Sequence, residues 1–264
     1  MAESRRRSSR EPALLGNHQR CWLWGRHLVL ETLRAGLWPV VELRLADNLS
    51  QEIERQAARL ASEADVRVVR ESTKRLSQRC GTQDHQGLLA KMRPFPYRLF
   101  DEVVTVADRH QALVMLDRIQ DPHNFGAIIR AAEVLGMDGL IVGTEEQSEV
   151  TAAVARSSAG AVNHLPIAQA PDLVDAVQIL RGRGVSIVAA DAHAGTSPSA
   201  RDLTIPTVFL LGNESSGVSG ELLALSDAAV QIPQAGRIES LNAAVAAGIL
   251  FYELQRQRKH PSSA

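Results

Sequence analysis

Three loops of the chain carry polar side chains that could hold a ligand and act on it. Each loop adjoins an apolar segment, and the polar residues concerned are Asn124, Arg130, Glu214, Ser240 and Asn242. Their amides, hydroxyl and guanidinium are groups that hydrogen-bond to hydroxyls and phosphates. Glu214 would repel a phosphate, which favours a ligand that brings a cation or hydrogen-bond donors to its loop.

The loops lack the patterns of the common nucleotide sites. The chain has no Gly-Lys-Ser or Gly-Lys-Thr triplet, and the pair Gly182 and Gly184 precedes an apolar run instead of following one. These features exclude a phosphate-binding P-loop and a dinucleotide fingerprint. The eight histidines and two cysteines show no metal-ligand spacing, so we expect no metal site.

The compartment is indicated by cysteine usage and hydropathy. Cys21 and Cys80 have no redox spacing and are expected to be free thiols in a reducing environment. No apolar run approaches the roughly 20 residues of a membrane span. The basic N-terminus is not followed by the apolar stretch of a signal peptide. We therefore expect a cytoplasmic protein with no membrane attachment.

Strand-like and helix-like segments alternate from about residue 111 and must position the three loops. The expected strands are 112–117, 138–143, 164–169, 185–190, 207–212 and 229–234. Helices are expected from about Asn124, over 149–160, over 171–184 and from Ser240 to near the C-terminus. This alternation predicts an α/β fold with a parallel sheet and helices on both faces. Ligands bind at the carboxyl ends of such strands, where the loops lie.

The last helix is rich in small residues between Ala243 and Gly248. Small side chains on an apolar helix let another backbone approach closely, which predicts a buried helix or a subunit contact. Ser240 or Asn242 is expected to cap its first turn.

The first third of the chain differs in charge from the rest. Residues 1–98 hold 18 Lys and Arg against 11 Asp and Glu, a net charge of +7, whereas the remainder holds 11 against 19, a net charge of −8. This asymmetry favours RNA binding by the first third, although a solvated basic surface would give the same count. Candidate phosphate contacts are Arg26, Lys74, Arg75 and Arg79.

Composition divides the chain into four parts. We expect residues 1–20 to be a disordered basic tail and residues 21–93 a small α/β unit that binds RNA. Residues 94–110, which contain two prolines, are expected to be a linker. Residues 111–260 are expected to form the parallel-sheet domain.

Arg130 has two interpretations from its pattern. It lies six residues after Asn124, which is roughly 240° around a helix axis. A lone arginine on an apolar helix is either a surface residue or a charge in a pocket, and spacing alone leaves both open.

The three loops together resemble the signatures of a known family. The motifs are Asn-Phe-Gly-Ala-Ile-Ile-Arg at 124–130, Leu-Gly-Asn-Glu at 211–214 with Gly217, and Ile232-Pro233 followed by Ser-Leu-Asn at 240–242. In order and spacing they resemble the SpoU (TrmH-like) branch of the SPOUT RNA methyltransferases, over about 113–258. The front unit, with residues 25–33 and 85–87, is similar to the substrate-binding domain of the ribosomal RNA guanosine 2′-O-methyltransferases of this family.

The resemblance implies a fold, a cofactor and a reaction. The C-terminal segment would form a deep trefoil knot, which is rare among folds. S-adenosylmethionine would be held by Leu211, Gly212, Gly217, Ile232 and Leu241. A homodimer would complete the active site, and the substrate would be a guanosine ribose in 23S (large-subunit) ribosomal RNA.

The resemblance also implies residue roles. Arg130 would be catalytic near the ribose 2′-hydroxyl, and it would be positioned with the substrate by Asn124, Glu214, Ser240 and Asn242. Arginine is normally always protonated, so both a proton-accepting role and a phosphate-clamping role stay open for Arg130. The usual Val-Ser-Val after Ser-Leu-Asn is Ala243-Ala-Val here, so one hydroxyl is missing.

Two other functions are compatible with the same motifs. One is 2′-O-methylation of transfer RNA, against which the ribosomal-type front unit argues. The other is a non-catalytic ribosomal RNA-binding assembly factor, against which the intact Arg130 and Asn242 argue.

Overall fold

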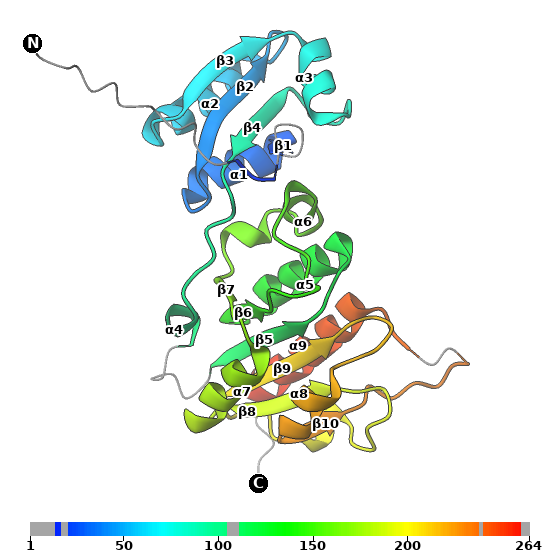
Figure 1. Cartoon of the computed structure of the whole chain (residues 1–264). Helices are drawn as coiled ribbons and strands as arrows, with labels where there is room; N and C mark the ends of the chain where they lie inside the picture. Colours follow the sequence, from blue (N-terminus) through cyan, green and yellow to red (C-terminus); the bar gives the residue numbers. More distant parts are fainter. Residues whose placement is uncertain (1–13, 17–20, 105–110, 238–239, 260–264) are drawn as a thin grey trace, which may run out of the picture. The chain divides into compact units, whose positions relative to one another are not determined.

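The computed structural model describes residues 14–16, 21–104, 111–237 and 240–259, and the chain folds into two compact units (Figure 1). The first unit spans 1–96 and the second 97–264. Most of the expected tail 1–20 lies outside the described residues. Of the expected linker 94–110, residues 94–96 fall in the first unit and 97–104 in the second.

The first unit is a four-stranded sheet in the order β1-β4-β2-β3 with three helices. The strands are β1 Trp22–Trp24, β2 Val40–Ala46, β3 Arg67–Glu71 and β4 Leu88–Met92, and the helices are α1 Arg26–Ala35, α2 Gln51–Glu63 and α3 Thr73–Cys80. The β2–β3 pair is parallel, whereas β4 runs antiparallel to β1 and β2. Because side chains alternate across a strand, Leu43 and Leu45 share one face of the sheet, and Arg44 lies on the other.

Local capping residues start and end the helices of this unit. The Ser50 hydroxyl caps α2 by accepting the Ile53 N–H, and Gly36 ends α1 with a left-handed φ of 66°. The apolar residues of α1 and α2, such as Val29 and Leu60, are buried. Helix α3 contacts β1, β2 and β4, and its Arg79 lies over Trp22 and pairs with Glu71. Trp22, Arg44 and Glu71 fall on the same sheet face by register, so α3 lies on the face opposite Leu43 and Leu45.

The second unit is a six-stranded, fully parallel sheet in the order β10-β8-β9-β5-β6-β7. Its strands are β5 Ala112–Asp117, β6 Gly139–Val142, β7 Ile167–Gln169, β8 Ser186–Ala190, β9 Thr207–Gly212 and β10 Ala228–Val230. Its α-helices are α4 Phe100–Val103, α5 Pro122–Val134, α6 Ala152–Ser157, α7 Leu173–Gly182, α8 Gly220–Leu225 and α9 Ala243–Lys259, with 3-10 turns at Ala161–Asn163 and Pro198–Ala200. The parallel sheet expected from the alternation is therefore confirmed.

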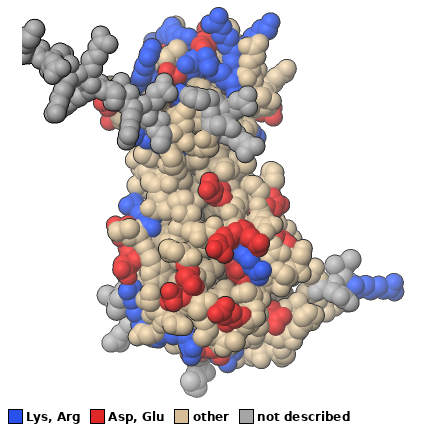
Figure 2. All heavy atoms as spheres, viewed as in Figure 1, with Lys and Arg blue, Asp and Glu red and all other residues tan. Residues whose placement is uncertain are grey.

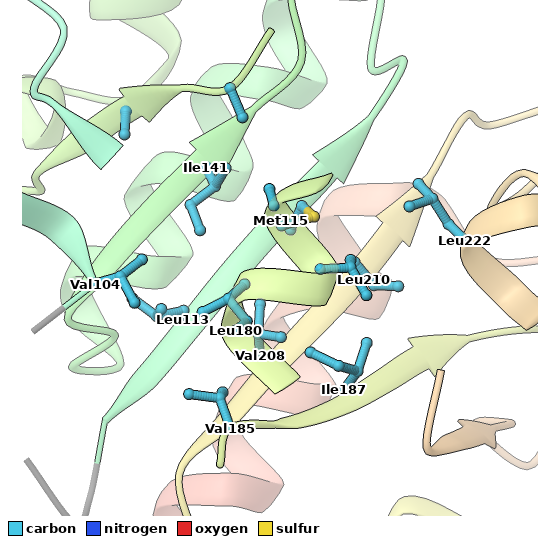
Figure 3. Close-up of a cluster of buried hydrophobic side chains, with 14 of the residues drawn as sticks. Val104, Leu113, Met115, Ile141, Leu180, Val185, Ile187, Val208, Leu210 and Leu222 are labelled. Atoms are coloured by element: carbon cyan, nitrogen blue, oxygen red, sulfur yellow. The ribbon is translucent and has the colours of Figure 1, made fainter. Parts of the chain in front are cut away.

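Apolar side chains on alternate strand positions fill both sides of this sheet. Figure 3 shows one side, where Leu180 of α7 and Leu222 of α8 pack with Leu113, Val208 and Leu210 of the central strands. On the other side lie α5 and α9, and the rings of Phe209 and Phe251 meet there with centroids 6.1 Å apart. Coverage of both faces explains why the strands read as continuous apolar runs.

Among the expected boundaries that differ from the structure, three adjoin the motif loops or the strand that leads into them. Helix α5 begins at Pro122 instead of Asn124, because the Asp121 carboxylate caps it. Strand β10 ends at Val230, because the Gln231 N–H turns to the Thr196 carbonyl at 2.8 Å. Helix α9 begins at Ala243, after Asn242, and Ser240 lies outside it.

None of the described helices is long and apolar enough to cross a membrane. Cys21 and Cys80 are not joined in a disulfide bond.

Candidate functional site

A cavity of about 420 Å³ opens at the carboxyl ends of β8, β9 and β10. The residues expected to hold a cofactor all line it: Leu211, Gly212, Gly217, Ile232 and Leu241. Glu214 and Ser240 line it as well. The cavity therefore collects the second and third motif loops, which lie about 20 residues apart in sequence, at one edge of the parallel sheet.

The loop after β9 turns back on itself at Gly212. A Cβ atom on Gly212 would lie 2.0 Å from the Gly217 carbonyl carbon, so only glycine allows this approach. Gly217 has a φ of 68°, which also favours glycine. Asn213 closes the turn, since its Oδ1 accepts the N–H groups of Ser215 and Ser216 at 2.9 and 3.3 Å.

The loop after β5 is tied to the loop after β9. The Asn213 amide donates to the Arg118 carbonyl at 3.0 Å, and the buried Asp117 accepts the Ser219 N–H at 2.7 Å. Arg118 has a φ of 61° and pairs with Asp117, and this hydrogen bond raises the pKa of the Arg118 guanidinium. These bonds hold the first and second motif loops in fixed relation.

Three of the expected site residues form one hydrogen-bonded chain. The Asn124 Nδ2 donates to Glu214 Oε1 at 2.7 Å, and the Asn242 Nδ2 donates to Asn124 Oδ1 at 2.8 Å. The Asn242 Oδ1 accepts the N–H groups of Ala244 and Val245 at 3.0 and 3.3 Å, which caps α9. Residues 118 positions apart are thus joined, and each asparagine donates and accepts in one defined orientation.

Arg130 does not join this chain. It is exposed on α5 and does not line the cavity, and its guanidinium makes no hydrogen bond or ion pair to any other residue in the described part of the chain. The first turn of α5 therefore reaches the site within one copy of the chain, whereas the guanidinium two turns further on does not.

The β8 loop contributes two cavity residues, and neither of them is among the site residues predicted from the sequence. Asp191 and His193 line the cavity. The available signal for Asp191 was its place directly after an apolar strand, as Asp117 follows β5. Among the described lining residues, Asp191 and Glu214 are the two carboxylates, and none is Lys or Arg.

The four candidate RNA contacts of the first unit are not equivalent. Arg26, Lys74 and Arg75 are exposed. Arg79 forms two 2.7 Å hydrogen bonds with Glu71, and its guanidinium and that of Arg44 lie over the Trp22 ring at 5.6 and 5.5 Å. The Arg79 guanidinium is therefore engaged with Glu71 and Trp22 of its own unit, whereas the other three side chains are exposed.

Arg44 and Arg79 both form ion pairs with Glu71, between α3 and the sheet, and these pairs stabilise the sheet. Hydrogen bonds from Arg79, and then from Arg44, lower the pKa of the Glu71 carboxyl to about 2. His85, in the turn before β4, is 2% exposed, and burial lowers the pKa of its imidazole. Its Nδ1 accepts the Gly87 N–H at 3.0 Å, so the neutral ring is part of the turn.

Within the described residues, no group of three or more His, Cys, Asp or Glu could hold a metal ion.

Comparisons with known proteins match both units. A family model described as the SpoU rRNA Methylase family matches residues 111–252, and one described as RNA 2′-O ribose methyltransferase substrate binding matches residues 22–98. YacO of Bacillus subtilis, assigned to the TrmH family of tRNA/rRNA methyltransferases, is 30% identical over 245 residues, covering 92% of this chain and 98% of YacO.

Two solved structures are similar over nearly the whole chain. The SpoU methyltransferase AviRb from Streptomyces viridochromogenes, in complex with AdoMet, has a TM-score of 0.79 at 30% identity, covering 93% of this chain and 95% of AviRb. An AdoMet-bound rRNA methyltransferase from Sinorhizobium meliloti has a TM-score of 0.79 at 29% identity, covering 93% of this chain and 89% of that one.

Proposed function

This chain belongs to the SpoU family of RNA methyltransferases, and from that premise we propose that it methylates the 2′-oxygen of a ribose in RNA. We further propose large-subunit (23S) ribosomal RNA as the substrate and a guanosine as the modified nucleotide. The compartment proposed is the cytoplasm, where cysteines such as Cys21 and Cys80, which form no disulfide bond, are usual.

The cavity fits S-adenosylmethionine, the cofactor that related structures contain. A volume of about 420 Å³ is typical of small-molecule sites. Leu211, Ile232 and Leu241 offer apolar contact, and Gly212 and Gly217 let the main chain approach closely. When bound, the cofactor supplies an electrophilic methyl group on a positively charged sulfur.

The observation that carries ribose methylation is the lack of a Phe, Tyr or Trp side chain on which a base could stack. None of the described residues lining the cavity is Phe, Tyr or Trp, so His193 is the one aromatic ring among them, and Phe125, the one aromatic residue in the three motifs, is fully buried. Enzymes that modify a base hold it by stacking and by hydrogen bonds to its edge. Asn124, Glu214 and Asn242 instead offer amide and carboxylate groups suited to a hydroxyl.

The residues around the cavity would mainly position the reacting atoms. Methyl transfer is an in-line displacement, for which holding the partners in line supplies much of the rate. The chain from Glu214 through Asn124 to Asn242 would fix the rim of the site, and Ser240 would contact the ribose from the cavity wall. We assign Arg130 to clamping the neighbouring phosphate and stabilising charge that develops on the ribose oxygen, since a guanidinium stays protonated.

Arg130 can serve the cavity if it comes from a second copy of the chain. Helix α9 supports a homodimer because it has two opposite apolar faces. Phe251 and Leu250 face the core of their own unit, whereas Val245, Ile249 and Tyr252 are 50, 39 and 61% exposed. Exposed apolar residues at this spacing form one stripe.

A knot in the C-terminal segment belongs to the same proposal. The chain leaves β10 at the edge of the sheet, and α9 then packs on α5 and β9 near its centre. This return across the sheet supports the expected knot in the C-terminal segment.

The first unit supports ribosomal RNA as the substrate. It corresponds to the matched substrate-binding model, and the rRNA methyltransferase from Sinorhizobium meliloti covers both units of this chain. Figure 2 shows Lys and Arg gathered on this unit. Lys74 and Arg75, exposed on α3, are the strongest candidates for phosphate contact, followed by Arg26 at the start of α1.

The test uses the alkali resistance of 2′-O-methylated linkages. The full chain is incubated with labelled S-adenosylmethionine and either unmodified 23S ribosomal RNA or unmodified transfer RNA, and the product is hydrolysed with alkali. We expect label in a guanosine-containing dinucleotide from ribosomal RNA, because a methylated 2′-oxygen cannot attack the adjacent phosphate. Label in mononucleotides would mean base methylation, and label in transfer RNA alone would overturn the substrate assignment.

A further inference from the structure

The cofactor cavity carries a second carboxylate that none of the three motifs contains. Asp191 directly follows β8, and Glu214 lies in the loop of the neighbouring strand β9. No Lys or Arg is present among the described residues that line this cavity. The described lining is therefore negatively charged, with two carboxylates and no fixed cation to balance them.

Asp191 is held in place by main-chain groups. Its N–H donates to the Val230 carbonyl at 3.0 Å, and its Oδ1 accepts the N–H of His193 at 2.9 Å. Its Oδ2 has no partner among the described residues. The carboxylate is thus fixed by the turn, and no ion pair within the described chain neutralises it.

The ligand of this cavity changes charge during the reaction. The bond from sulfur to the methyl carbon breaks and its electron pair stays on sulfur, while the ribose oxygen bonds the methyl group and releases its proton to solvent. The sulfonium of S-adenosylmethionine thereby becomes the neutral thioether of S-adenosylhomocysteine. An anionic wall stabilises the first ligand more than the second.

We propose that Asp191 determines specificity for the charged cofactor over the spent one. Its carboxylate stabilises the sulfonium-bearing ligand and gives no such advantage to the thioether, so transfer itself weakens binding and promotes release of the product. This inference deepens the proposed function and rests on its cofactor site, but it does not depend on which RNA or which atom is methylated.

The test measures binding of three ligands to the full chain by calorimetry. S-adenosylmethionine and sinefungin both carry a positive charge at the transferring position, whereas S-adenosylhomocysteine does not. The variant Asp191→Asn keeps the Oδ1 acceptor for His193 and removes only the charge. We expect it to weaken both cationic ligands about tenfold, and S-adenosylhomocysteine less than threefold.

A matched control is Asp175→Asn, at an exposed position on α7 outside the cavity. It should leave all three dissociation constants within twofold. An equal loss for all three ligands in Asp191→Asn would mean that Asp191 contacts a part they share, and would overturn the proposal. No change for any ligand would overturn it too. Failure of RNA methylation would leave these binding results unaffected, so the two proposals fail separately.

Discussion

At the scale of single residues, the site depends on the orientation of two amides. The Asn124 amide donates to Glu214 and accepts from Asn242. The side chain at this position must therefore carry a hydrogen-bond donor and an acceptor on the same terminal group. Sequence alone placed these residues in separate loops, and the resemblance implied their roles. Their direct contact could not be predicted, because it depends on where three strands end.

Asn124→Asp should abolish most methyl transfer. A carboxylate at this position would face Glu214 with two acceptors and no donor, so the two anions would repel each other and open the chain. We expect a rate at least 100-fold below that of the native chain in single-turnover assays. Asn48→Asp, at an exposed position that only accepts a hydrogen bond from Thr73, is the control and should be neutral. If Asn124→Asp methylated RNA at the native rate, the hydrogen bonds that join Glu214, Asn124 and Asn242 would have no role in the reaction.

Arg130→Ala should abolish turnover while cofactor affinity changes by less than about threefold. The proposal assigns the cofactor to the second and third motif loops and Arg130 to the RNA, so the loss of the guanidinium removes charge stabilisation during transfer without removing a cofactor contact. Arg130→Lys should fail as well if the clamp is bidentate. The control is Arg181→Ala. Arg181 lies on α7 and forms an exposed ion pair with Asp227. Turnover by Arg130→Ala near the native level would contradict the assignment.

Lys74→Ala combined with Arg75→Ala should weaken RNA binding and flatten its salt dependence. Each phosphate contact adds roughly 0.7–0.9 to the slope of log affinity against log salt, so losing two should reduce the slope by about 1.5. The control is Arg55→Ala with Arg59→Ala on α2, across the sheet from α3. Binding measured by filter retention at several salt concentrations should separate the pairs, and equal effects would remove α3 from the RNA surface.

At the scale of elements, the sequence predicted types well and boundaries less well. The strands and helices of the parallel sheet follow from apolar runs, and in the first unit Ser50 and Gly36 lie at the start of α2 and the end of α1, as local capping rules favour. The misplaced ends have different causes. Asp121 caps α5 directly before Pro122, and Asn242, the second of the two expected caps, is the one that starts α9, so both helix starts follow local capping signals. Strand β10 instead ends through a tertiary contact, because the Gln231 N–H donates to the distant Thr196 carbonyl.

The sheet of the first unit should lose stability in acid in two stages. The folded-state pKa of His85 lies below its ordinary value, so as pH falls through about 6.5 the unfolded chain takes up a proton that the folded chain does not. Glu71 has a folded pKa of about 2 against an ordinary 4.5, so its contribution is present above pH 4.5 and is lost between pH 4.5 and 2. This second stage corresponds to about 3 kcal/mol in the free energy of unfolding.

Urea unfolding of the full chain can follow this unit alone. All three tryptophans, Trp22, Trp24 and Trp38, lie in it, so their fluorescence reports its unfolding. Glu71→Gln should be less stable at pH 7 and should lose the decline below pH 4.5, while the His85 stage is kept. An unchanged acid profile in Glu71→Gln would show that the Glu71 ion pairs contribute no net stability.

At the scale of the whole molecule, the two apolar faces of α9 have different roles. The sequence predicted a helix that was buried or formed a subunit contact, and the small residue Ala247 belongs to the buried face, at 0% exposure. A bulky charge at Ala247 would therefore disrupt the fold of one chain. The outer stripe of Val245, Ile249 and Tyr252 is the surface on which the dimer is to be tested.

Ile249→Arg should yield monomers that bind cofactor weakly and do not methylate RNA. An arginine at position 249 would place an unpaired, desolvated charge in an apolar subunit contact, and such a charge costs several kcal/mol. The control is Ile179→Arg, at an isoleucine on α7 that is 45% exposed against 39% for Ile249. Sedimentation velocity should show monomers for Ile249→Arg and dimers for the control. A dimeric, active Ile249→Arg would place the subunit contact elsewhere.

Asn242 belongs to two equilibria at once. Its amide group holds Asn124 at the site, and its carbonyl oxygen caps the helix whose outer stripe is the proposed dimer surface. Any factor by which dimerisation changes cofactor affinity must equal the factor by which the cofactor changes the dimer dissociation constant. The enzyme would then sense its own concentration: activity per molecule falls on dilution, and an excess of cofactor restores it by drawing the two copies together.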